Sequence, residues 1–109
     1  MRNRVVKALA LMLALAVGAH AEGKISIVEV WGGMVEGALT IHLYMTPESA
    51  DPNAKQIQAA VCYYLAEFGV KPPARYEFYR WSPVPAGGFE PLKVAEGKML
   101  SCDTPLKEA

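Results

Sequence analysis

The chain has 109 residues, with 11 basic and 11 acidic side chains, and hydrophobic residues make up 52% of it. This length suits one small domain, and the apolar content is high enough to build a folded core. Beyond residues 1–7 the sequence has no basic cluster of the kind that binds the phosphate backbone, which argues against nucleic acid as a partner.

The first 21 residues have the features of a secretory signal peptide. Residues 1–7 hold three basic side chains and no acid, residues 8–18 are uncharged and apolar, and Ala19-His20-Ala21 offers the small-x-small pattern that signal peptidase reads. A membrane anchor and a buried N-terminal helix are the alternatives. The apolar run is about half the length of a spanning helix and has no helical period. We therefore expect cleavage after Ala21, export to a periplasm or the extracellular medium, and no stable membrane span afterwards.

Residues 22–109 would then form a single small domain of 88 residues. Removal of the three basic residues of the signal leaves eight basic and 11 acidic side chains, a net charge of −3. The domain has two cysteines, Cys62 and Cys102, and an even number of cysteines in a small exported domain favours a disulfide. Free thiols, a metal site and a catalytic thiol are the alternatives, although a nucleophilic cysteine needs a base and His42 is the only histidine left. We expect no metal and no cofactor.

The first two predicted elements are strands. Residues 24–31 are apolar and β-branched, and Gly32-Gly33 follows as a turn signal. Residues 37–46 alternate strictly between apolar and polar side chains, which predicts a strand with one buried face and one wetter face. The wetter face carries His42 and Tyr44.

The register of this first hairpin stays open. A two-residue turn at Gly32-Gly33 pairs Trp31 with Met34 and places Ser26, Val28 and Val30 on the core face. It also sets Glu29 opposite Glu36, and facing like charges are unfavourable. The alternatives are a shift by one residue, which moves Trp31 into the core, a bulge near Gly37, or a cation held between the two acids.

The next predicted element is an amphipathic helix. Asp51 and Pro52 suit an N-cap and the first helical position, and Gly69 suits the end. Between them the apolar residues recur along one face, at Ile57, Val61, Tyr64, Leu65 and Phe68. Cys62 lies at the edge of this apolar stripe.

Two more strands are expected after the helix, at residues 74–81 and 89–102. The last strand should be broken or bulged near Ala95 to Gly97, Pro91 suits an edge position, and residues 103–109 form a loose polar tail. The order strand, strand, helix, strand, strand predicts an α+β two-layer domain, with a four-stranded, mostly antiparallel sheet and one helix on one face. A bridge from Cys102 to Cys62 would tie the last strand to the helix.

His42 is the candidate for acid–base chemistry. A catalytic histidine needs a nucleophile and an orienting group, and its neighbours on the same strand face are only Thr40 and Tyr44. No phosphate-binding glycine loop, zinc-ligand spacing, haem motif or serine elbow is present in the sequence. The residues favour a non-enzymatic protein, and a small exported hydrolase-like enzyme centred on His42 is the alternative.

The sheet face away from the helix is the candidate binding face. Tyrosine, tryptophan and arginine are enriched at binding hot spots, although aromatic side chains also suit strands as such. We expect an exported interaction module whose partner is a protein, either a second copy or another envelope or extracellular protein; self-association alone is a third possibility. The predicted face holds His42, Tyr44, Arg75, Tyr79 and Trp81, together with Glu77, and Ile25, Ile27 and Trp31 as further members.

Overall fold

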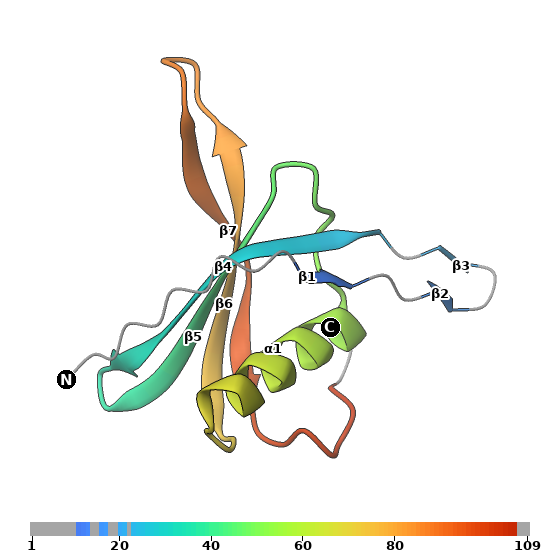
Figure 1. Ribbon diagram of the computed structural model, residues 1–109, viewed down its shortest axis with the longest axis vertical. Helices are drawn as coiled ribbons and strands as arrows, with labels where there is room; N and C mark the ends of the chain where they lie inside the picture. The colour runs from blue at the N-terminus through green and yellow to red at the C-terminus, as the bar shows by residue number, and fades with distance from the viewer. Residues whose placement is uncertain (1–10, 14–15, 18–19, 22, 107–109) are drawn as a thin grey trace.

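The computed structural model describes residues 11–13, 16–17, 20–21 and 23–106 (Figure 1). Three short strands lie in the first part: β1 (Leu11–Leu13), β2 (Ala16–Val17) and β3 (His20–Ala21). β1 pairs antiparallel with the start of β4, and β2 pairs with β3. Most of the predicted signal peptide lies outside the described residues, so cleavage after Ala21 stays a prediction.

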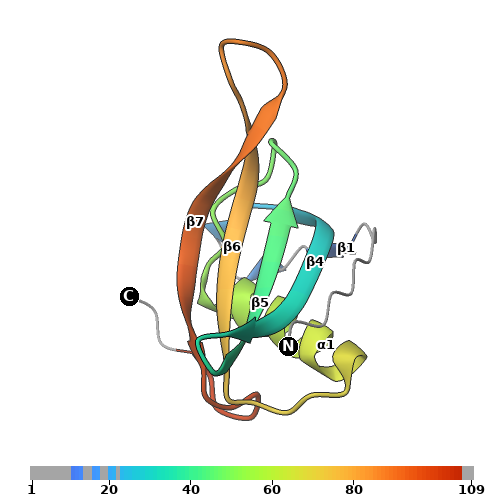
Figure 2. The same cartoon turned by 90° about the vertical axis from the view of Figure 1, so that its left-hand side faces the viewer.

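The described elements form an α+β fold of the expected order. β4 (Ile25–Val35) and β5 (Ala38–Met45) precede helix α1 (Ala54–Phe68), and β6 (Ala74–Pro83) and β7 (Phe89–Met99) follow it. The sheet order is β1-β4-β5-β6-β7. The two hairpins are antiparallel, whereas β5 and β6 are parallel because α1 carries the chain back to the starting end of the sheet. The four long strands thus form a mixed sheet of order ββαββ, and α1 lies behind one face of it (Figure 2).

The core lies between α1 and the sheet. Buried and more exposed positions alternate over residues 41–45 of β5 and 74–79 of β6 as the sequence pattern predicts, with Leu43 and Phe78 both 0% exposed. Thr40, expected on the wetter face, is instead buried, with 3% of the residue exposed. Tyr64 on the apolar stripe of α1 is also fully buried, and Leu39 and Phe68 pack at the margin of this cluster. Among the described residues, no helix covers the opposite face of the sheet.

The predicted turn at Gly32-Gly33 is wrong. β4 continues through both glycines, and the chain turns at Glu36 and Gly37, which have φ values of 52° and 80°. Positive φ at both central residues gives the twist that tight hairpins need. Gly32 lies against the helix instead, because a Cβ there would stand 3.0 Å from the ring of Phe68. Glu29 therefore pairs with Tyr44, not with Glu36.

A bulge at Val28 changes which residues of β4 face the core. The register with β5 shifts between Ile27 and Glu29, so Ile25 and Ile27 lie in the core together with Val30. The predicted core position of Ser26 and Val28 is wrong, and so is the placement of Ile25 and Ile27 on the binding face. One extra residue inverts the strand alternation, and the apolar pattern of this segment does not reveal where the extra residue sits.

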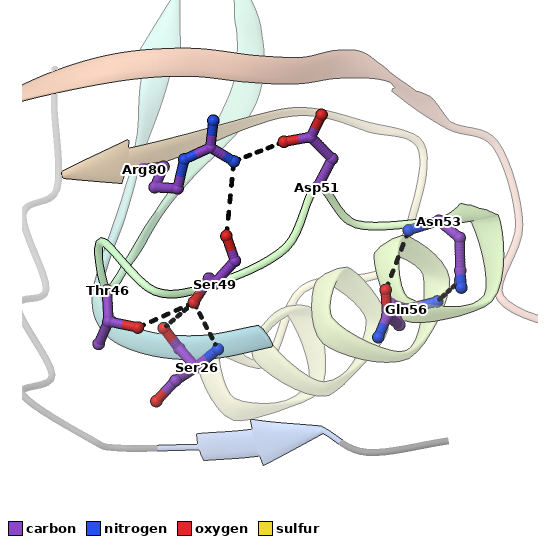
Figure 3. A network of polar contacts seen from close by, with 7 residues as sticks. All are labelled: Ser26, Thr46, Ser49, Asp51, Asn53, Gln56 and Arg80. Atoms are coloured by element: carbon purple, nitrogen blue, oxygen red, sulfur yellow. Dashed lines mark hydrogen bonds and ion pairs between the residues drawn. The ribbon is translucent and has the colours of Figure 1, made fainter. Parts of the chain in front are cut away.

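Helix α1 begins two residues later than predicted. Its N-cap is Asn53, whose side chain accepts a hydrogen bond from the Gln56 amide at 2.9 Å, and Gln56 Oε1 accepts one from the Asn53 amide at 3.0 Å (Figure 3). Asp51 instead binds Arg80 on β6, with 2.5 Å between Oδ1 and Nη1. The predicted end at Gly69 is confirmed by its left-handed conformation, with φ at 71°.

The disulfide between Cys62 and Cys102 is confirmed, with 6.0 Å between the two Cα atoms. β7 ends at Met99, so Cys102 lies beyond the strand, in the C-terminal segment that the disulfide attaches to α1. The side chain of Gln58 holds this segment by donating to the Thr104 carbonyl at 2.8 Å and accepting from the Leu106 amide at 3.0 Å. The expected loose tail is therefore wrong for residues 103–106, and residues 107–109 lie outside the described chain.

Candidate binding surface

The sheet face opposite α1, here called the open face, brings together side chains from four strands. The parallel register of β5 and β6 sets His42 beside Glu77 and Tyr44 beside Tyr79. β4 adds Trp31 next to His42, and β7 adds further side chains along the outer side of β6. The open face comprises Glu29, Trp31, His42, Tyr44, Glu77, Tyr79, Trp81 and Lys93.

Four aromatic rings form a continuous row across β5 and β6. Tyr44 stacks on Tyr79, with ring centroids 5.0 Å apart and 15° between the planes, and on Trp81, at 5.4 Å and 25°. His42 extends the row at the other end, 6.3 Å from Tyr79. All four residues are half-buried. Each stacked pair contributes about 1 kcal/mol beyond its buried area, so the row is held in place by its own members.

Glu77 is the polar centre of the open face. Its Oε1 accepts a hydrogen bond from the Tyr79 hydroxyl at 2.5 Å and lies 3.1 Å from His42 Nδ1, while Oε2 lies 3.7 Å from Lys93 Nζ. The hydrogen bond from Tyr79, together with Lys93 and His42, lowers the pKa of the Glu77 carboxyl despite its partial burial. Burial and the neighbouring carboxylate raise the pKa of Tyr79. At neutral pH the face therefore presents an ionised Glu77 beside a neutral phenol.

Two hollows flank the aromatic row. One of about 360 Å³ lies between Trp31, His42 and Tyr44, and the backbone of Gly32 and Gly33 contributes to its wall. The two glycines, expected only to form a turn, thus line this hollow with backbone alone, while the missing side chain of Gly32 leaves room for Phe68 on the helix side of the sheet.

The second hollow, of about 280 Å³, lies at the other end of the row. Trp81 and Phe89 line it together with residues from β4 and from the loop after β5, and Phe89 is 58% exposed. Phe89 was missing from the predicted face because its strand pairing with Pro83, which places it beyond Trp81, depends on the length of the β6–β7 turn.

The structure gathers most, but not all, of the predicted face. His42, Tyr44, Tyr79 and Trp81 lie in one row, whereas Arg75 lies apart, opposite Thr40 and Lys98 near the other end of the sheet. Sequence reasoning also missed Lys93. Its place beside Tyr79 follows from a bulge at Val94, where the register between β6 and β7 shifts, one residue before the break or bulge predicted at Ala95 to Gly97.

The surroundings of His42 supply a carboxylate and a hydroxyl group. The Glu77 carboxylate orients the imidazole, as general acid–base catalysis requires. The hollow beside it offers only one hydroxyl, that of Tyr44, and no thiol. Within residues 11–13, 16–17, 20–21 and 23–106, no three side chains of the metal-binding types cluster together. In the same residues, no helix is long and apolar enough to cross a membrane.

Comparison with protein-family models, with curated proteins and with solved structures finds no match to this chain.

Proposed function

We propose that this protein is a small, exported, non-enzymatic interaction module that binds a partner protein through its open face. The observation that carries the proposal is the row of stacked, half-buried rings of His42, Tyr79, Tyr44 and Trp81 on the sheet face opposite α1. Large aromatic side chains that are already held in place lose little conformational entropy on binding, which favours them as contact residues.

Export is part of the same proposal. The Cys62–Cys102 disulfide supports an oxidising compartment, because disulfides persist there and are common in small secreted domains. The basic start, the apolar run and the Ala19-His20-Ala21 pattern support removal of the first 21 residues. We place the mature protein in a periplasm or the extracellular medium.

The test removes the two rings of the row that lie on β6. The oxidised mature protein serves as bait in the envelope fraction and medium of its native host, and each captured protein is then bound again in purified form. The double variant Tyr79→Ala/Trp81→Ala should lower affinity for the true partner by at least about tenfold, since hot-spot aromatics contribute on the order of 2 kcal/mol each. Circular dichroism and an intact Cys62–Cys102 bridge verify the fold.

The matched control is Tyr63→Ala. Tyr63 is 39% exposed and lies on α1, away from the open face. This variant should bind as the wild type does. Equal affinity of the double variant, or an equal loss in Tyr63→Ala, would refute the open face as the binding site.

The alternative function is a hydrolase-like enzyme centred on His42, and the 3.1 Å contact between His42 and Glu77 is the observation that favours it. A panel of ester and amide substrates separates the two functions. The enzyme requires turnover that His42→Ala abolishes, whereas the interaction module shows no His42-dependent turnover with any of them.

A further inference from the structure

The edge of β4 that faces away from β5 is paired only over a short stretch. Among the described residues only the short strand β1 pairs there, opposite Ile25, Ser26 and Ile27. Lys24 and Ser26 direct their backbone groups inward. The Ser26 amide donates to Ser49 Oγ at 2.9 Å (Figure 3), and the Ser26 carbonyl accepts from the Thr46 amide at 3.0 Å. The Lys24 carbonyl accepts from the Ala50 amide at 2.9 Å. Because backbone direction alternates along a strand, Ile25 and Ile27 direct theirs outward, toward β1.

β1 lies inside the segment that export would remove. The inference therefore rests on the cleavage after Ala21 that the proposed function includes. The mature chain would present the amides and carbonyls of Ile25 and Ile27 at a free sheet edge, next to two side chains that are 0% exposed while β1 is present. Such an edge is a template for another strand, and the segment from Ile25 to Val28 contains no proline or charge that would discourage pairing.

We propose that two mature chains pair through this edge, antiparallel, around a two-fold axis at Ser26. The register of β1 provides the argument, since Leu11, Met12 and Leu13 lie opposite Ile27, Ser26 and Ile25. In the self-paired arrangement, Ile25 and Ile27 of the second copy take the positions of the two leucines, and its Ser26 takes the position of the methionine. The edge thus offers the same apolar, small, apolar pattern to itself, and a two-fold contact requires such self-complementarity.

Charge and geometry both fit this pairing. Lys24 falls opposite Val28 of the second copy, so no like charges face each other. Because the isoleucines of both copies lie on the same side, the two helices also share one side, and the two open faces join on the other. The dimer therefore presents two aromatic rows on one continuous surface, which would bind a repeated or two-fold partner with avidity.

A cysteine at position 26 tests the axis directly. Residues facing each other in a pair without mutual hydrogen bonds lie about 4.5 Å apart at Cα, within the range that a disulfide spans. Ser26→Cys, exported and purified without reductant, should run as a covalent dimer on non-reducing gels, while peptide mapping retains the Cys62–Cys102 bridge. Val28→Cys is the matched control, since its two copies would lie about 13 Å apart along the strands and should stay unlinked.

Charge exchange at the same position gives a second, non-covalent readout. Sedimentation of the mature wild-type protein should give twice the mass of one chain. Ser26→Glu and Ser26→Lys should each sediment as a monomer, and their equimolar mixture should regain the dimer. Leu100→Glu, at a position 69% exposed and beyond β7, should remain dimeric.

The outcomes separate this inference from the proposed function. A cleaved chain that sediments as a monomer, or a Ser26→Cys chain that stays unlinked or links only to a different protein, overturns the dimer and leaves open-face binding intact. An intact mass that retains residues 1–21 overturns both the cleavage and the dimer, because β1 then occupies the edge. Loss of partner binding in Tyr79→Ala/Trp81→Ala with an unchanged dimer mass is expected if both proposals hold.

Discussion

The ring of Tyr76 on β6 lies directly on the backbone of Gly97 on β7. A Cβ atom at Gly97 would stand 2.7 Å from Tyr76 Cζ, and the ring itself is nearly buried, with 6% of the residue exposed. β7 is not broken near Ala95 to Gly97, and the bulge that was the other prediction for this place lies one residue earlier, at Val94. Gly97 is the place where an edge strand makes room for a large side chain of its neighbour.

Gly97→Ala should destabilise the protein by about 1–3 kcal/mol, because the buried ring of Tyr76 has to move. Urea unfolding measures the change in free energy. In a Tyr76→Ala background the clash disappears, and alanine is intrinsically better than glycine within a strand, so the same substitution should become neutral or stabilising. An equal penalty in both backgrounds would mean that Tyr76 is not the cause.

Cys62→Ser should lower the free energy of unfolding by about 4 kcal/mol, the chain-entropy value for a loop of 40 residues. Thermal unfolding measures the loss. Cys102→Ser should cost the same, and the double variant no more than either single one, because all three remove one bond. A melting temperature equal to that of the wild type would show that the bridge does not constrain the unfolded chain.

Glu77→Gln should make the free energy of unfolding depend less steeply on pH in the acid range. The pKa of Glu77 in the folded protein lies below its ordinary value of 4.5, so the unfolded chain takes up the proton first as the pH falls. The stabilisation is complete above about pH 4.5 and is lost as the pH falls through the folded-state pKa. Urea unfolding between about pH 7 and 2 should show a shallower slope for Glu77→Gln. Glu90→Gln, exposed on β7, is the control and should keep the wild-type slope.

Glu36→Asn should stabilise the protein by about 0.5–1 kcal/mol. Glu36 has a φ of 52°, a left-handed conformation that asparagine adopts more readily than glutamate, and Asn-Gly is the preferred pair for this type of turn. Gly37→Ala should instead cost about 1 kcal/mol, because Gly37 has a φ of 80°. Urea unfolding compares both variants with the wild type, and a destabilised Glu36→Asn would contradict the turn at these two residues.

Much of the fold could be read from local patterns. The stripe from Ile57 to Phe68 indicates α1 because it repeats with the period of a helix, and the alternation from Leu39 to Met45 indicates a strand with two unlike faces. The Cys62–Cys102 pairing followed from an even cysteine count in a short chain predicted to be exported. These features depend on residues close together in sequence or on composition, so no knowledge of distant contacts was needed.

The tertiary structure decided what depends on contacts between distant segments. Phe68 packs on Gly32, so β4 passes through the two glycines and turns at Glu36 and Gly37. The bulge at Val28 then sends Ile25 and Ile27 into the core. Such choices follow from how a strand meets the helix above it and not from its own residues, which is why they could not be predicted.

The same division holds for the candidate site. The sequence by itself determined that His42 and Tyr44 share one strand face and that Tyr79 and Trp81 share another, because alternation along a strand is local. Only the tertiary structure decided that those two faces are adjacent, since the crossover through α1 makes β5 and β6 parallel neighbours and their register sets His42 beside Glu77. The register between strands is set by many weak contacts across the sheet and with α1. These contacts join distant segments, so no short stretch of the sequence predicts the register.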